Sequence, residues 1–184
     1  MQERIIFAGF GGQGILFMGK LLCFTMMNRG LHVTYIPSYG AEMRGGTANC
    51  HVIVSDTPIA SPLVTRATMS VVMNQPSYEK FKTRLDDGAF FFVNSSLVKT
   101  AEPPENVNIL QVPATQKAHE LGDVRLANMI MFGVINTAKK FMDTDYLFSQ
   151  LPEFLGKKKL KFLDANKKAI LEGERYAKEV LGIV

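Results

Sequence analysis

The feature that most constrains the fold is a run of glycines close to the N-terminus. Residues 9–14 read Gly-Phe-Gly-Gly-Gln-Gly, and they lie between the apolar run 4–8 and the apolar segment 15–22. A strand, a glycine turn and a helix in this order form the context in which a G-x-G-x-x-G match gains meaning. The pattern therefore predicts an α/β protein, while the ligand stays open.

The glycines of this turn have separate expected roles. Gly9 and Gly11 allow a sharp turn and leave no Cβ in the way of a phosphate or a neighbouring backbone. Gly14 lets the start of the helix lie close to the strand. The N–H groups of the first helical turn form an anion site if that end is open to solvent. A turn that only packs helix on sheet explains the same pattern.

The second predicted strand lacks the acid that an NAD-binding enzyme uses. In such enzymes an Asp or Glu about 20 residues after the glycine turn holds a ribose hydroxyl. Here the strand at 31–36 ends in Pro37 and Ser38, and Glu42 lies further on in a different loop. This absence counts against a free-standing NAD(P)- or FAD-binding Rossmann protein, which stays as the alternative, beside a nucleotide-binding regulatory module.

Strands and helices alternate along most of the chain, and a helical block closes it. We predict strands at 4–9, 31–36, 47–55, 68–74, 88–94 and 107–112, and helices at 14–29, 76–84, 115–121, 125–141, 144–155 and 159–181. The third strand follows the second too closely for a parallel crossover, which needs about a dozen residues, so we expect it to be antiparallel. The fold class is α/β, with a Rossmann-like open, mostly parallel but mixed sheet, helices on both faces and a helical C-terminal block.

The length of the chain indicates one domain spanning 1–184. A chain of 184 residues that is 47% hydrophobic can bury one substantial core. The first strand begins almost at once, so we expect no signal peptide. No apolar stretch reaches about 18 residues without charge or turn signals, so we expect no membrane span and a cytoplasmic protein.

Two of the predicted helices carry further information. The helix at 125–141 is apolar almost all round from Leu126 to Ala138, so it is either a core helix or a subunit interface. In a chain this small we favour the interface, and we expect exposed apolar surface and a homodimer when the chain is isolated. Gly173 lies inside the last helix, where it costs about 1 kcal/mol relative to Ala, so we expect another backbone to approach it closely.

Basic residues are concentrated near the C-terminus. The net charge is +4, and eight basic residues face three acids between Lys157 and Lys178. Aromatic residues are not interleaved there as stacking platforms, which argues against nucleic acid. A solvated helix face, or a docking surface for an acidic protein, is the better interpretation.

The side chains that bind metals are too few for a metal site within this chain. Cys23 and Cys50 lie in apolar segments and are expected to be small core residues. An iron–sulfur cluster or a structural zinc needs about four such ligands, so we expect no metal-binding residue. His32, His51 and His119 lack carboxylates at a useful spacing, and we expect structural roles and no catalytic residue.

The most specific stretch of the sequence is 37–56. It contains Gly40, Gly45 and Gly46 around Glu42 and Arg44. Arg44 could hold a phosphate or a carboxylate in a bidentate contact. A Glu–Arg pair that only pins a tight loop explains these two residues equally well.

The runs Gly-Phe-Gly-Gly-Gln-Gly and Ser-Tyr-Gly-Ala-Glu-Met-Arg-Gly-Gly-Thr-Ala-Asn together resemble one family. They look like the gamma subunit of 2-oxoacid:ferredoxin (acceptor) oxidoreductases, most of all the 2-oxoglutarate type. Pyruvate and branched-chain relatives share enough of the pattern to stay open. Segment 122–133 and the spacing of Asn166, Ala169 and Gly173 are similar as well, so the resemblance covers nearly the whole chain.

The resemblance implies a subunit of a heteromeric complex that oxidatively decarboxylates a 2-oxoacid to an acyl-CoA and passes electrons to ferredoxin or a related acceptor. It implies alpha, beta and ferredoxin-like partner subunits, on which thiamine diphosphate, magnesium and iron–sulfur clusters lie. This chain would be structural, inactive when isolated, and close to the coenzyme A site. For a CoA phosphate we nominate Gly11, Gly12, Gln13, Gly14 and Arg44, although Gln13 could instead fill the crevice.

Overall fold

The structure, a computed structural model, describes residues 1–38 and 47–182. Its contacts divide the chain into two compact units, Met1–Val112 and Pro113–Val184. Each unit is described by itself below. The single domain expected from the length of the chain stays a prediction.

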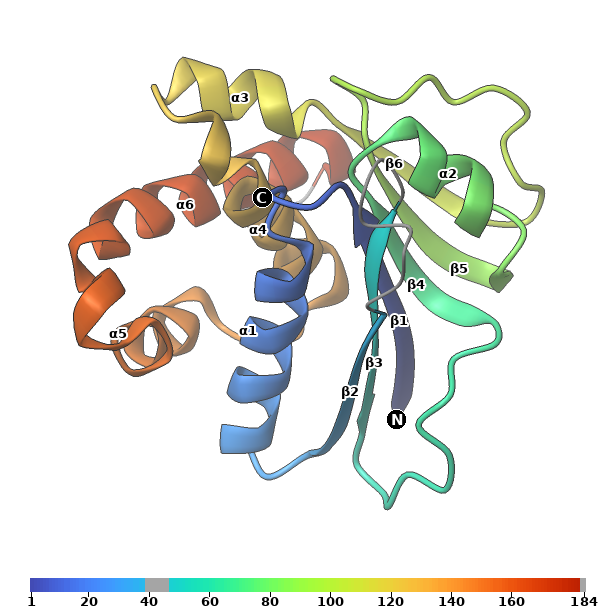
Figure 1. The fold of residues 1–184 in the computed structure, drawn as a ribbon, viewed down its shortest axis with the longest axis horizontal. Coiled ribbons are helices and arrows are strands. Elements are labelled where there is room, and N and C mark those ends of the chain that lie inside the picture. The colour runs from blue at the N-terminus through green and yellow to red at the C-terminus, as the bar shows by residue number, and fades with distance from the viewer. Residues whose placement is uncertain (39–46, 183–184) are drawn as a thin grey trace. The chain divides into compact units, whose positions relative to one another are not determined.

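A mixed sheet of six strands, in the order β2-β3-β1-β4-β5-β6, forms the first unit (Figure 1). The strands are β1 (Gln2–Gly9), β2 (His32–Ser38), β3 (Ala48–Ser55), β4 (Ala67–Val72), β5 (Leu85–Asn94) and β6 (Asn108–Val112). Strand β3 runs antiparallel to both β1 and β2, while the pairs from β1 through β6 on the other side are parallel. The antiparallel strand expected from the short gap before 47–55 is therefore confirmed.

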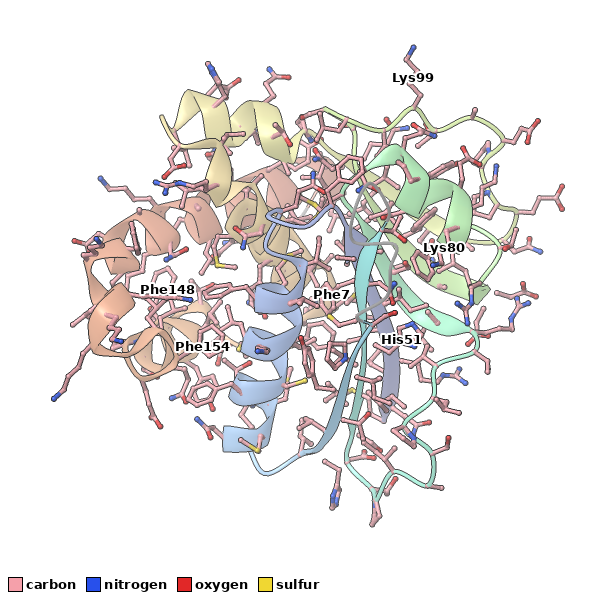
Figure 2. All side chains as sticks on the ribbon, viewed as in Figure 1. Phe7, His51, Lys80, Lys99, Phe148 and Phe154 are labelled. Carbon is pink, nitrogen blue, oxygen red and sulfur yellow. The ribbon has the colours of Figure 1, made fainter. Side chains whose placement is uncertain are left out.

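Helices cover both faces of this sheet. Helix α1 (Ile15–Asn28) lies over the face that carries Cys50, because a Cβ on Gly19 would come within 2.6 Å of the Cys50 sulfur. Phe7 pairs in register with Cys50 and lies on the same side (Figure 2). On the other face, Tyr78 of α2 (Gln75–Phe81) packs in one buried cluster with Ile6. The expected coverage on both faces is confirmed.

The connections leave the sheet in opposite directions from β1 and β4. From β1 the chain passes through α1 to β2 at one edge, whereas from β4 it passes through α2 to β5 on the other side. The neighbouring pair β1 and β4 is thus a topological switch point. Open α/β sheets bind ligands in the crevice outside the carboxyl ends of strands at such a point.

Helices make up the second unit. They are α3 (Ala114–Glu120), η2 (Val124–Leu126), α4 (Ala127–Lys139), α5 (Thr144–Lys159), η3 (Leu160–Phe162) and α6 (Leu163–Leu181). Helices α4 and α6 cross with their backbones in contact, since a Cβ on Gly173 would overlap the carbonyl oxygen of Ile130. In the same way, a Cβ on Gly133 would overlap the carbonyl oxygen of Ile170. The close approach expected at Gly173 is confirmed.

The prediction of an exposed apolar surface on 125–141 is wrong. Ten consecutive residues of α4, from Ala127 to Asn136, are buried, so the helix has no exposed face along this stretch. The physical reason is that α4 is the central helix of its unit and packs against α3 and α6. The expected homodimer therefore loses the surface from which it was argued.

Among the described residues, no helix combines the length and the apolar character that crossing a membrane requires.

Candidate functional site

The glycine turn joins β1 to α1 at the switch point. Gly12 has a φ of 95° and Gly14, the N-cap of α1, has a φ of 73°. Residues with a Cβ rarely adopt this left-handed conformation, whereas glycine adopts it without steric cost. Two of the four nominated positions in the turn thus require glycine for the path of the backbone.

Gln13 closes the turn from within. Its Oε1 accepts a hydrogen bond of 2.7 Å from the Phe10 N–H, and its Nε2 donates one of 3.1 Å to the Met73 carbonyl. Gly9 makes room for this, because a Cβ there would lie 2.7 Å from the Gln13 Oε1. Both polar atoms of the Gln13 amide are engaged by the backbone, so this side chain positions the loop after β1 against the end of β4.

The outer side of the turn is open. A Cβ added at Gly11 or Gly12 would meet no atom within 4 Å, and Phe10 is 42% exposed. Glycine at the N-cap has no side chain with which to cap the first turn of α1. The start of a helix carries roughly half a positive charge, which favours an anion beside it. The open outer side of the turn, its backbone N–H donors and the positive charge at the start of the helix all suit a phosphate.

Two asparagines at the same end of the sheet extend the site. The Met73 carbonyl accepts a second hydrogen bond, of 3.4 Å, from Asn94 Nδ2 at the end of β5. Asn74 Oδ1 accepts a hydrogen bond of 2.8 Å from the Ser77 N–H and so caps α2. Asn74 Nδ2, by contrast, is buried without a partner in the described part of the chain. Sequence reasoning missed both residues. The available signal was that each directly follows an apolar run in the sequence.

Arg44 lies outside the described residues, as do Gly40, Glu42, Gly45 and Gly46. The strands on either side of that segment are described. Ser38 pairs with Asn49, and Ala48 pairs with Gly9 at the end of β1. The described strand ends on either side of that segment, Ser38 of β2 and Ala48 of β3, therefore lie at the end of the sheet where the glycine turn begins.

Neither cysteine of this unit is a ready nucleophile near neutral pH. Burial raises the pKa of the Cys23 thiol to about 12, and burial followed by the nearby Cys23 raises the pKa of Cys50 as well. Both cysteines are buried and free, as expected for core residues. Burial, with the charges of Arg84 and Lys80, lowers the pKa of His51, so this imidazole is neutral at pH 7.

These residues do not suit an iron–sulfur cluster. The chain has two cysteines, fewer than a cluster needs, and neither forms a thiolate near neutral pH. Within the described ranges, no three His, Cys, Asp or Glu side chains converge as metal ligands.

Comparison with protein families and curated proteins identifies relatives along nearly the whole chain. The model for "Pyruvate ferredoxin/flavodoxin oxidoreductase" matches residues 4–176. Ketoisovalerate oxidoreductase subunit VorA of Methanothermobacter thermautotrophicus is 33% identical over 97% of this chain, which spans only 37% of that relative. 2-Oxoglutarate synthase subunit KorC of Methanocaldococcus jannaschii is 34% identical over 73% of this chain and 74% of its own length.

Solved structures show the same fold. The gamma subunit of a keto/oxoacid ferredoxin oxidoreductase from Geobacter sulfurreducens superposes with a TM-score of 0.83 at 24% identity, over 96% of this chain and 97% of its own. A second structure is the 2-oxoglutarate:ferredoxin oxidoreductase of Magnetococcus marinus, solved with 2-oxoglutarate, coenzyme A and succinyl-CoA bound. It superposes with a TM-score of 0.87 at 26% identity, over 97% of this chain and 31% of its own.

These findings confirm the resemblance to gamma subunits and do not favour a free-standing NAD(P)- or FAD-binding protein. The fold class is confirmed by the same superpositions. On the match to residues 4–176, the chain belongs to the pyruvate ferredoxin/flavodoxin oxidoreductase family.

Proposed function

We propose that this chain is the gamma subunit of a heteromeric 2-oxoacid:ferredoxin (acceptor) oxidoreductase, which converts a 2-oxoacid and CoA to an acyl-CoA and CO₂. The family match over residues 4–176 supports this, as does the gamma subunit from Geobacter sulfurreducens, which this chain covers almost completely. The alpha, beta and ferredoxin-like chains are its partners, and ferredoxin or a related acceptor takes the electrons. The complex works in the cytoplasm.

2-Oxoglutarate is the proposed substrate. The KorC relatives are separate short chains, and the one from Methanothermobacter marburgensis is covered over 100% of its length at 28% identity. Substrate contacts are expected on the partner subunits, so the recurrence of 2-oxoglutarate synthase subunits among the relatives is the feature that favours 2-oxoglutarate here.

The partner subunits hold thiamine diphosphate, magnesium and iron–sulfur clusters. When bound, thiamine diphosphate would stabilise the negative charge that develops as a 2-oxoacid loses CO₂. This chain's own part is to bind and orient. Its described residues offer the backbone N–H donors of the glycine turn, and no acid and base side chains lie paired beside that turn.

The single observation that carries a role in CoA binding is the open outer side of the glycine turn at the switch point. We assign a CoA phosphate to the backbone around Gly11, Gly12 and Gly14, with Gln13 holding the turn in place. Arg44 supplies a charge-assisted hydrogen bond, a type worth about 1.5–3 kcal/mol. The turn-only interpretation remains its competitor.

The test of the proposed function is purification of the tagged chain from its native cell. We expect a thiamine-binding chain and a ferredoxin-like chain to co-purify in fixed ratio, and the complex to reduce ferredoxin with 2-oxoglutarate and CoA. Turnover with pyruvate or 2-oxoisovalerate in place of 2-oxoglutarate would correct the substrate. A chain that purifies alone and binds NAD(P) or FAD would overturn the function.

A further inference from the structure

Seven consecutive residues, from the end of α5 through η3, are exposed. This lysine segment, residues 156–162, reads Gly-Lys-Lys-Lys-Leu-Lys-Phe and contains no acid. The helical backbone of α5 is interrupted at Gly156, where φ is 65° and ψ is 170°, and the segment ends in η3. The bend thus places four lysines on a short, solvent-facing stretch.

Three lysines of this segment have no acidic partner among the described residues, in contrast to the cations of α6. Arg175 pairs with Glu172 at 2.8 Å, and Lys178 pairs with Glu174 at 2.9 Å. Lys157, Lys158 and Lys161 form no ion pair with any acid in the described ranges. Cations that no acid of their own chain neutralises are available to an acidic partner.

Apolar side chains lie among these cations. Leu160 is 46% exposed and Phe162 is 38% exposed. The Phe162 ring has the Lys161 Nζ at 5.1 Å from its centroid and the Arg125 guanidinium carbon at 6.0 Å. An exposed aromatic ring with two cations beside it has the composition of a protein contact that combines an apolar anchor with a charged rim.

We infer that the lysine segment docks an acidic surface of another protein subunit, with Phe162 and Leu160 in apolar contact and Lys157, Lys158 and Lys161 facing carboxylates. The identity of that subunit rests on the proposed function, since it is a partner chain of the same complex. A lipid surface fits less well, because two apolar side chains at a bend lack the apolar face with which interfacial helices bind. Nucleic acid fits less well, because one ring offers no series of stacking platforms.

The experiment measures the affinity of the full chain for the remaining subunits of the complex at low and at high salt. Wild-type affinity should fall as salt rises. The variant Lys157→Glu/Lys158→Glu/Lys161→Glu should bind about tenfold or more weakly, with most of the salt dependence gone. Phe162→Ser should weaken binding and keep the salt dependence. Circular dichroism confirms that each variant is folded.

A matched control separates local contact from net charge. Lys20→Glu/Lys99→Glu/Lys140→Glu makes the same change from +4 to −2, since each variant exchanges three positive for three negative charges. These three lysines are exposed, and Figure 2 shows Lys99 pointing away from the fold. The control should bind within about twofold of the wild type, as expected for charges outside an interface.

Two results would overturn the inference. One is a charge-reversal variant that binds the partner subunits as tightly as the wild type. The other is a charge-reversal variant that loses binding to vesicles of phosphatidylserine and phosphatidylcholine but keeps its binding to the partner subunits. That result would make the segment a membrane contact. A wild-type chain that binds none of the partner subunits would overturn the proposed function itself, and the partner assigned here with it.

Discussion

Substitutions at single residues of the glycine turn can distinguish a role in ligand binding from a role in packing. Gly11 has open space at its Cβ position and no left-handed backbone, whereas Gly12 has open space but a φ of 95°. Gly11→Val should therefore raise the KM for CoA about tenfold in the assembled complex without lowering its yield. Gly12→Val should also lose about 1–2 kcal/mol of stability, because a branched residue is strained in the left-handed region.

The control for this prediction is Gly122→Val. Gly122 has a φ of 87° and the same open space, but it lies in the second unit. It should lose stability as Gly12→Val does and leave the KM for CoA unchanged. Arg44→Ala should raise that KM with the complex intact. Unchanged KM values in Gly11→Val and Arg44→Ala, with a lower yield of complex, would show that the turn only packs the helix.

Gln13 is predicted to act on CoA binding through the shape of the turn. Gln13→Glu keeps an acceptor for the Phe10 N–H but places a carboxylate against the Met73 carbonyl, where the amide donates now. Loss of one partly buried hydrogen bond should lower the free energy of unfolding by about 1–3 kcal/mol and raise the KM for CoA. Urea unfolding and steady-state kinetics measure the two effects.

Gln111→Glu is the matched control, because Gln111 is exposed and its partner, the Thr100 hydroxyl, can donate to a carboxylate. Equal stability and equal KM in Gln13→Glu and Gln111→Glu would show that the Gln13 bonds do not shape the site.

At the scale of helices and strands, sequence patterns predicted nearly all elements because each depends on neighbours in the chain. Apolar runs between turn residues identified the strands, and the short gap before β3 identified its antiparallel direction. Gly173 predicted a close contact, but the partner on α4, Gly133, is 40 residues away and was missed. Without that pair, an all-round apolar helix reads equally as core or interface, and the interface was wrongly favoured.

The candidate site was less predictable for the same reason. The glycines of the turn were evident, since backbone conformation is a local property. The bond from Gln13 to the Met73 carbonyl joins residues 60 positions apart, and Asn94 reaches the same carbonyl from another strand. Such pairings depend on sheet order, which no local pattern in this sequence specifies.

The crossing of α4 and α6 gives a prediction whose sign is informative. By helix propensity alone, Gly173→Ala would stabilise the chain by about 1 kcal/mol. A Cβ there would overlap the Ile130 carbonyl oxygen and lie 3.0 Å from the Val134 nitrogen, so the helices must separate. We expect a loss of about 2–3 kcal/mol on urea unfolding. Gly11→Ala, which adds a Cβ in open space, should change stability by less than about 0.5 kcal/mol.

Helices α3 and α6 are also joined by a carboxylate whose titration affects stability. Hydrogen bonds from Arg175 and Lys117 lower the pKa of Glu172 from 4.5 to about 2. A lowered pKa in the folded state means that the stabilisation is present above the unfolded value and is lost as the pH falls from about 5 to about 2. Glu172→Gln should flatten the fall in unfolding free energy over this range. Equal pH dependence in the variant and the wild type would contradict the assignment.

At the scale of the whole molecule, the prediction is that the isolated chain has no oxidoreductase activity. Decarboxylation of a 2-oxoacid needs a group that stabilises a carbanion, and passing electrons onward needs a redox centre. The chain has two cysteines, both buried with raised pKa values, and its described residues form no cluster of metal ligands. Purified chain with 2-oxoglutarate, CoA and an artificial electron acceptor should give no turnover, whereas adding the partner subunits should restore it. Turnover by the chain alone would mean that the active centre lies within these 184 residues and that the assignment as a subunit is wrong.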